Sequence, residues 1–149
     1  MIYILVAAGA LVCLAAEPFL KDENKHKVLP WIASLFILAG MGAYALCTTD
    51  TVYNLYAMDP VRRILGVTVL LCAFLGIAGI QWTLGHEKFK GGEAYGLTLL
   101  ASCGALLMTQ SIDYLALFLA MELTSFPVYA LVGIRRHLQN AGEGVFKYF

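Results

Sequence analysis

The 149-residue sequence predicts an all-α integral membrane protein, a bundle of five transmembrane helices followed by the start of a sixth. Apolar residues make up 60% of the chain and charged residues 13%, whereas soluble domains average roughly 45–50% and about 25%. Five apolar runs have about the 20 residues that are needed to cross about 30 Å of hydrocarbon. Ten basic residues balance ten acidic ones, so there is no positive surplus for binding nucleic acid. We therefore expect one membrane domain over residues 1–149.

The first apolar run extends from Ile2 to Leu20 and has the position of a signal peptide. It lacks the basic residues that begin such a peptide, and it continues into Glu17 and Pro18 instead of a small-residue cleavage site. We expect this run to remain in the protein as the first transmembrane helix.

The later runs follow one another with short connections. They are Val28–Thr48, Val61–Leu84, Ala94–Gln110, Tyr114–Ile134 and a sixth, from Ala141, that is cut off at Phe149. The fourth and fifth are separated by so few residues that they must be antiparallel neighbours, and Asp113 is a natural N-cap for the fifth. Small residues that would let helix backbones approach closely occur in three clusters, Gly40/Gly42/Ala43, Gly76/Gly79 and Ala101/Gly104/Ala105.

The basic residues predict the orientation of the bundle. Seven Lys and Arg side chains follow the first, third and fifth runs, whereas the connections on the opposite side hold only Arg62 and Arg63. Positively charged loops remain on the cytoplasmic side, so we expect the N-terminus outside, in the periplasm. Trp31 and Trp82 would then lie at the cytoplasmic interface of a bacterial inner membrane or an equivalent energy-converting membrane.

The sequence carries no motif for a cofactor or a metal ion. It has no Gly-rich dinucleotide or phosphate loop and no Cys and His residues at ligand spacing. The four cysteines all lie in apolar runs, where we expect buried structural thiols: Cys13, Cys47, Cys72 and Cys103. We expect neither a metal site nor a cofactor-binding site in this chain.

Glu122 is the ionisable residue that lies deepest in an apolar run. It stands about nine residues into the fifth run, hence roughly 13 Å from its start, where a charge costs several kcal/mol unless it meets a partner or water. It is either a structural carboxyl, hydrogen-bonded to Thr124, Ser125 or a neighbouring helix, or a proton-carrying site. We favour the second interpretation, because a helix break at Pro127 would leave the Leu123 carbonyl as a free acceptor beside it.

Lys147 is the expected partner of Glu122. It would lie about 9 Å below the cytoplasmic boundary and Glu122 about 16 Å below it. With helices packed 8–10 Å apart, the two backbones would be roughly 12 Å apart, so the side chains could meet directly or through water. Glu143 precedes Lys147 by four residues and could hold the ammonium from the cytoplasmic side, or form a local pair with it that excludes Glu122.

Two stretches, LFLAMELTSFPVYALVG at 117–133 and EGVFKYF at 143–149, carry a resemblance to a known family. The chain resembles the N-type antiporter-like subunits of respiratory complex I, called NADH-quinone oxidoreductase subunit N or NADH dehydrogenase subunit 2. The family pattern is a fifth helix with F-x-x-x-E-L-x-S-x-P and a sixth with E-x-x-x-K-Y. Because family members have about fourteen helices, the resemblance implies the N-terminal portion of such a subunit, or one piece of a split subunit.

The resemblance also implies a function. Glu122 and Lys147 match the family's helix-5 glutamate and helix-6 lysine, so the chain would supply part of a proton path in a translocating NADH-quinone oxidoreductase. Flavin, iron–sulfur clusters and quinone would be held by partner subunits, and the other membrane subunits and the bilayer would be its partners. Related antiporter-like proteins share much of the pattern. A subunit of a cation/proton antiporter or membrane-bound hydrogenase complex therefore stays an alternative, as does a structural segment that translocates nothing.

Overall fold

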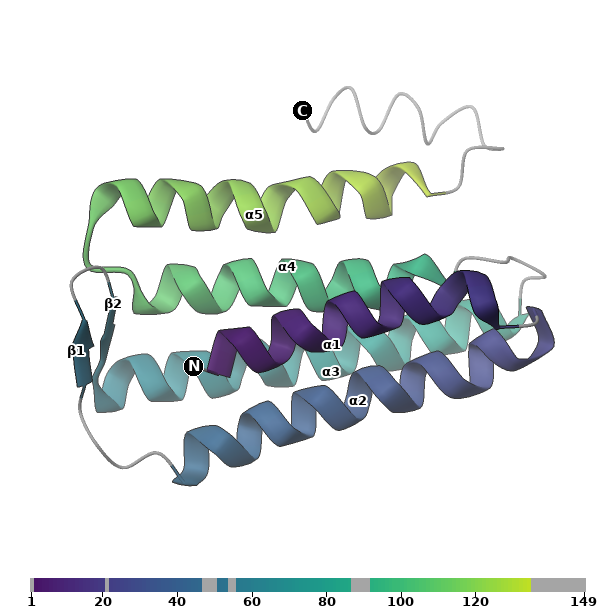
Figure 1. Cartoon of the computed structure of the whole chain (residues 1–149), viewed down its shortest axis with the longest axis horizontal. Coiled ribbons are helices and arrows are strands. Elements are labelled where there is room, and N and C mark those ends of the chain that lie inside the picture. The colour runs from purple at the N-terminus through teal and green to yellow at the C-terminus, as the bar shows by residue number, and fades with distance from the viewer. Residues whose placement is uncertain (1, 21, 47–50, 54–55, 87–91, 135–149) are drawn as a thin grey trace.

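The computed structural model describes residues 2–20, 22–46, 51–53, 56–86 and 92–134. Within these ranges the chain forms an up-and-down bundle of long helices that lie side by side (Figure 1). The helices are α1 (Ile2–Ala16), α2 (Asp22–Leu46), α3 (Pro60–His86), α4 (Glu93–Gln110) and α5 (Tyr114–Gly133). A short 3-10 helix, η1 (Glu17–Phe19), continues α1, and an antiparallel hairpin of β1 (Thr51–Tyr53) and β2 (Tyr56–Met58) precedes α3.

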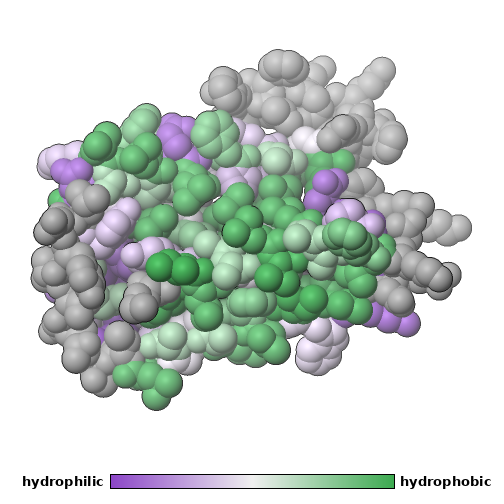
Figure 2. Space-filling model, in the orientation of Figure 1, coloured by the Kyte–Doolittle hydropathy of each residue, from purple (hydrophilic) through white to green (hydrophobic). Residues whose placement is uncertain are grey.

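The outer surface of the bundle is apolar. Figure 2 shows hydrophobic side chains over most of the middle of one face, and large apolar side chains such as Leu11, Leu35 and Leu119 are more than half exposed. Four helical segments are long and apolar enough to cross a membrane, and they correspond to α1 with η1, α2, α3 and α5. The chain is a multi-pass integral membrane protein, since only lipid suits such a surface.

Helix α4 differs from the other four because protein surrounds it. It packs against α1, α3 and α5, and half of its 18 residues are buried. Small and hydroxyl-bearing side chains such as Thr98, Ser102 and Gly104 lower its hydropathy. By length and composition alone α4 is not among the membrane-crossing helices of the described residues, so its crossing of the bilayer stays a prediction.

Two glycines of α4 permit this close packing. A Cβ on Gly96 would lie 2.6 Å from Leu14 of α1, and one on Gly104 would lie 2.5 Å from the Thr124 hydroxyl oxygen of α5. The cluster of small residues around Gly104 therefore marks a close helix contact, as predicted. The same prediction was wrong for Gly42 and Gly79, since no described atom lies within 4 Å of a Cβ built at either position.

The junction between α1 and α2 is tighter than the sequence suggested. We expected the second helix to begin at Val28 after a basic loop, whereas α2 begins at Asp22. An acidic residue in the first turn stabilises a helix N-terminus, and the extra turns carry Lys25 and Lys27. The Lys25 ammonium lies 2.6 Å from the Glu17 carboxylate of η1 and fixes this turn.

At the opposite end of the bundle, side-chain hydrogen bonds and a β-bridge stabilise the connection between α4 and α5. The Asp113 carboxylate accepts hydrogen bonds from the backbone N–H groups of Leu115 (3.0 Å) and Ala116 (3.3 Å), so the predicted N-cap is confirmed. Tyr56 of β2 forms a bridge to Ser111. The β-hairpin was not expected from the sequence.

Candidate functional site

Glu122 lies near the middle of α5, as the ninth of its 20 residues. The side chain is half-buried. The buried face of α5 carries Ala116, Ala120 and Pro127 and packs on α4. Glu122 follows Ala120 by two residues, about 200° around the helix. The carboxylate is therefore on the side of α5 that faces away from α4.

The hydroxyl groups beside Glu122 are used by the helix itself. The Thr124 hydroxyl donates to the Ala120 carbonyl and the Ser125 hydroxyl to the Met121 carbonyl, both at 2.9 Å. Within the described part of the chain, Glu122 has no hydrogen bond or ion pair. Neither Thr124 nor Ser125 therefore holds the Glu122 carboxylate by a hydrogen bond in the structure.

Pro127 is buried inside α5, and the helix continues past it to Gly133. Proline has no N–H group, so the Leu123 carbonyl, four residues earlier, lacks its helical donor. The helix is nevertheless not interrupted at this point.

The two other residues expected in the proton path, Glu143 and Lys147, lie outside the described residues, as does the whole helix expected from Ala141. The Glu122–Lys147 pair therefore stays a prediction. Of the two residues, the structure places Glu122, half-buried near the middle of a helix that is long and apolar enough to cross a membrane.

A hollow of about 330 Å³ lies between α3, α4 and α5. Its lining includes Thr124, two residues after Glu122 but on a different side of α5. Its lining is rich in small and hydroxyl-bearing side chains: Thr68, Val69, Cys72, Ala73, Thr98, Ala101, Ser102, Ala105 and Thr124. The hydroxyls of Thr98 and Ser102 donate to carbonyls of α4 itself, at 2.8 Å in each case. Sequence reasoning noted only the alanines and Gly104 on α4 and missed this hollow.

A second polar cluster, also missed, closes the end of the bundle at the α4–α5 connection. The Arg62 guanidinium donates to the carbonyls of Gln110 (2.8 Å) and Ser111 (3.3 Å) and lies 3.3 Å from the Asp59 carboxylate. The Gln110 amide, almost fully buried, donates to the Tyr44 hydroxyl at 2.5 Å. A cation at the C-terminal carbonyls of α4 stabilises the helix end, so this cluster has a structural role.

The described residues contain no group of three or more His, Cys, Asp or Glu side chains that could hold a metal ion. Cys13 and Cys103 are buried, as expected, and the Cys103 thiol lies 3.4 Å from the Tyr3 carbonyl oxygen. Cys72 is exposed on α3, contrary to the expectation of a buried thiol. Cys47 lies outside the described residues.

Comparison with curated proteins finds many relatives with one name, NADH-quinone oxidoreductase subunit N. The chain is 31% identical to the protein from Cupriavidus taiwanensis, 29% to that from Myxococcus xanthus and 28% to that from Geobacillus. Each match covers 97–98% of this chain and 29–31% of the relative. The chain thus spans about a third of the length of the curated relatives it matches. No family model matches it.

Among solved structures, the chain is similar to one chain of the respiratory complex I from Thermus thermophilus with bound aureothin. The TM-score is 0.78 at 23% identity, and the match covers 100% of this chain and 32% of that one. At this identity the match shows the fold. Together with the named relatives, it confirms the resemblance to the N-terminal part of the N-type subunit.

Proposed function

We propose that this chain is the N-terminal part of a proton-translocating membrane-arm subunit of an NADH-quinone oxidoreductase. The name of its relatives, their match along nearly the whole chain and the shared fold support this proposal. In this proposal the chain performs no redox chemistry. Flavin, iron–sulfur clusters and quinone belong to other subunits, and the neighbouring membrane subunits are its partners.

The observation that carries the proposal is the position of Glu122. A carboxylate at the middle of a membrane-crossing helix costs several kcal/mol unless a charge or water meets it. The described residues supply neither an ion pair nor a hydrogen bond to it. We infer that its partner lies outside the described residues, and Lys147 is the cation that the sequence predicts there.

The proposed mechanism uses Glu122 and Lys147 as two stations of one path. A charged Lys147 keeps Glu122 ionised, and Glu143 holds the ammonium from the cytoplasmic side. When a conformational change in the complex weakens the Glu122–Lys147 pair, the Glu122 carboxylate accepts a proton from buried water. The Lys147 ammonium then releases its own proton along buried water, away from Glu122. When the pair forms again, the proton held by Glu122 passes to Lys147, so both charges are restored and one proton has moved along the path.

Replacement of Glu122 by glutamine tests the proposal. Glu122→Gln keeps the shape of the side chain but cannot ionise, so we expect proton pumping by the assembled complex in inverted membrane vesicles to fall about tenfold or more. Glu93→Gln is the matched control, because Glu93 is an exposed carboxylate at the start of α4. Assembly should be unchanged in both variants.

Three results would contradict the proposal. Full quinone-coupled pumping in Glu122→Gln would indicate a structural segment that translocates nothing. Equal losses in Glu122→Gln and Glu93→Gln would show that any lost carboxylate disturbs the complex. Proton movement that depends on sodium ions, in the same vesicles, would indicate the antiporter class instead.

A further inference from the structure

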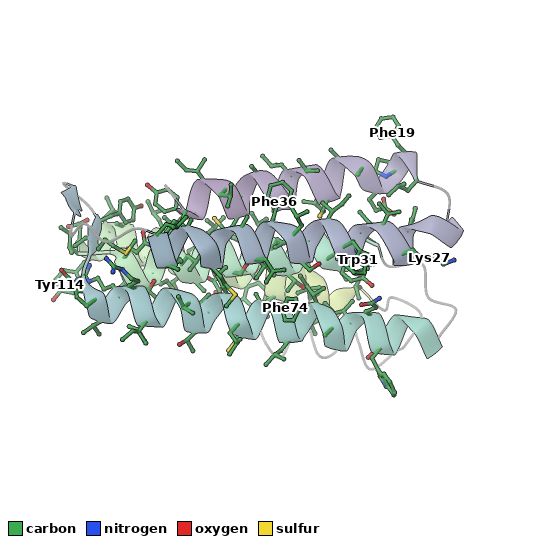
Figure 3. All side chains as sticks on the ribbon, turned by 90° about the horizontal axis from the view of Figure 1, so that it is seen from below. Phe19, Lys27, Trp31, Phe36, Phe74 and Tyr114 are labelled. Carbon is green, nitrogen blue, oxygen red and sulfur yellow. The ribbon has the colours of Figure 1, made fainter. Side chains whose placement is uncertain are left out.

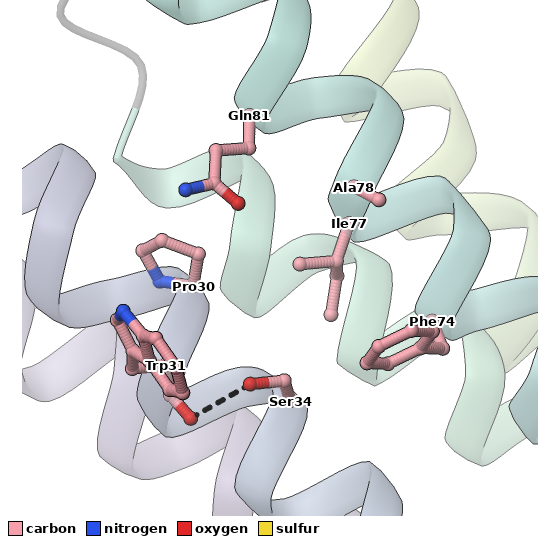
Figure 4. Close-up of a pocket in the computed structure, with 7 residues that line it drawn as sticks. All are labelled: Pro30, Trp31, Ser34, Phe74, Ile77, Ala78 and Gln81. Carbon is pink, nitrogen blue, oxygen red and sulfur yellow. Dashed lines mark hydrogen bonds between the residues drawn. The ribbon is translucent and has the colours of Figure 1, made fainter.

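A groove with a volume of about 210 Å³ runs between α2 and α3 near the end of the bundle that carries the α1–α2 junction (Figure 4). It is lined by Pro30, Trp31 and Ser34 of α2 and by Phe74, Ile77, Ala78 and Gln81 of α3. The lining is mainly apolar. The groove is open to the outside and lies away from Glu122.

The groove is polar at only one of its ends. Since α2 and α3 are antiparallel, Pro30 and Gln81 lie at the same end of the groove, and Ser34 and Phe74 lie farther along it (Figure 4). The Ser34 hydroxyl donates to the Trp31 carbonyl at 3.0 Å. Gln81 is exposed, and no hydrogen bond joins its amide to another described residue, so the amide can reach a ligand in the groove.

A cation stands beyond this polar end. Lys27 precedes Trp31 by one helical turn, about 6 Å along the axis, and Figure 3 shows Lys27, Trp31 and Phe74 in succession along the groove. Lys27 is exposed and has no ion-pair partner among the described residues. Its neighbour Lys25 differs, since it is bound to Glu17.

The order of side chains along the groove, first a cation and an amide and then apolar groups, matches the headgroup and acyl chain of a phospholipid at the membrane–water interface. Trp31 is 76% exposed and Trp82 is 73% exposed at the same end, and tryptophan concentrates at the membrane–water interface. The groove then extends from headgroup level, at Lys27 and Gln81, into the hydrocarbon at Phe74. Basic residues between helices on the cytoplasmic side are known to bind acidic headgroups.

We propose that this groove binds one anionic phospholipid. The Lys27 ammonium pairs with the acidic headgroup, the Gln81 amide donates to a phosphate or ester oxygen, and the Trp31 indole covers the glycerol region. The first part of one acyl chain lies between Pro30 and Phe74. A zwitterionic lipid fits the apolar part equally well, but its own cation opposes Lys27, so the site is selective for negative charge.

Tryptophan fluorescence tests the site directly, because the chain has two tryptophans. In Trp82→Phe, Trp31 is the only reporter. The full chain is placed in phosphatidylcholine vesicles that contain an equal mole fraction of either brominated phosphatidylglycerol or brominated phosphatidylcholine, whose bromine atoms quench a tryptophan in contact. We expect quenching to show about fivefold stronger binding of the phosphatidylglycerol.

Two further substitutions distinguish the effect of the Lys27 charge from the effect of the shape of the groove. Lys27→Gln should abolish the preference, and Ala78→Phe, which narrows the groove without changing charge, should weaken it at least twofold. Trp31→Phe provides the matched control, because Trp82 does not line the groove and should report nearly equal quenching by the two lipids.

Four results would overturn the proposal. Equal quenching of Trp31 by both lipids shows a groove without selectivity, and a preference that survives Lys27→Gln comes from another charge. Protection of Trp31 from both lipids shows that protein covers the groove. A preference that appears only in Glu23→Gln shows that Glu23, at the spacing of a favourable helical pair with Lys27, neutralises the cation in the native chain.

Discussion

At the scale of single residues, the most informative one is a carboxylate whose depth can be calculated from the sequence. Glu122 was singled out because an apolar run leaves few positions from which a charge can reach water, and helical rise converts position into depth. The structure adds the direction, away from α4. Its expected partner, Lys147, lies outside the described residues, and the pairing stays a prediction because contacts across helices depend on packing that spacing alone does not determine.

The coupling of Glu122 with Lys147 can be measured with a double-mutant cycle. If the pair works as a unit, Lys147→Met and Glu122→Gln should lower proton pumping to similar extents, and the double variant should be little worse than either single one. Lys147→Arg should retain only part of the activity, because a guanidinium keeps its charge and does not readily release a proton. The measurement is pumping in vesicles with equal amounts of assembled complex.

Strictly additive losses in that cycle would contradict a shared path. A harmless Lys147→Met would mean that Lys147 serves only Glu143 or the membrane interface. Either result would leave Glu122 without its proposed partner.

The main contacts of Arg62 were missed because its partners are backbone carbonyls. The Arg62 guanidinium lies 3.3 Å from the carboxylate of Asp59, three residues earlier in the chain. Its additional contacts with the carbonyls of Gln110 and Ser111 join residues 48 and 49 positions apart. No sequence pattern reports such contacts, since every residue has a carbonyl.

At the scale of elements, the apolar runs predicted where the helices lie, but they did not predict the helix ends that are polar. Helices α4 and α5 begin at Glu93 and Tyr114, where the apolar runs start within one residue. Helix α2 begins six residues before its apolar run, because its first turns are hydrophilic and extend past the hydrocarbon. The hairpin before α3 was missed because its strands have only three residues each, too few for an alternating pattern to be recognised.

The contact between α4 and α5 predicts opposite effects of one substitution at two glycines. Gly104→Ala should lower the free energy of unfolding by about 1–3 kcal/mol, because its methyl group would overlap the Thr124 backbone and hydroxyl. Gly79→Ala places the same methyl group in open space, so it should be neutral or stabilise the protein by up to about 1 kcal/mol.

Unfolding of both glycine variants by a denaturing detergent in mixed micelles would measure this difference. Equal stabilities would show that α5 shifts without cost, and that the close approach at Gly104 is not needed for the bundle.

At the scale of the whole molecule, the orientation of the bundle in the membrane is a proposal that rests on the basic residues near one end. We expect the N-terminus outside. In a background with the four native cysteines replaced by serine, Thr51→Cys should react with a membrane-impermeant reagent in intact cells. Lys21→Cys should react only after the membrane is opened, and the reverse pattern would contradict the positive-inside argument.

The central position of α4 has a consequence for how the bundle is made. A helix whose polar and small residues are suited to protein neighbours partitions weakly into lipid by itself, and α5, which follows after only Ser111–Asp113, is strongly apolar. The contact at Gly104 joins these two helices, and the Asp113 cap fixes the first turn of α5 directly after α4 ends. We therefore expect α4 and α5 to enter the bilayer together during biosynthesis, as a helical hairpin, and the retention of α4 in the membrane to depend on the helix synthesised after it.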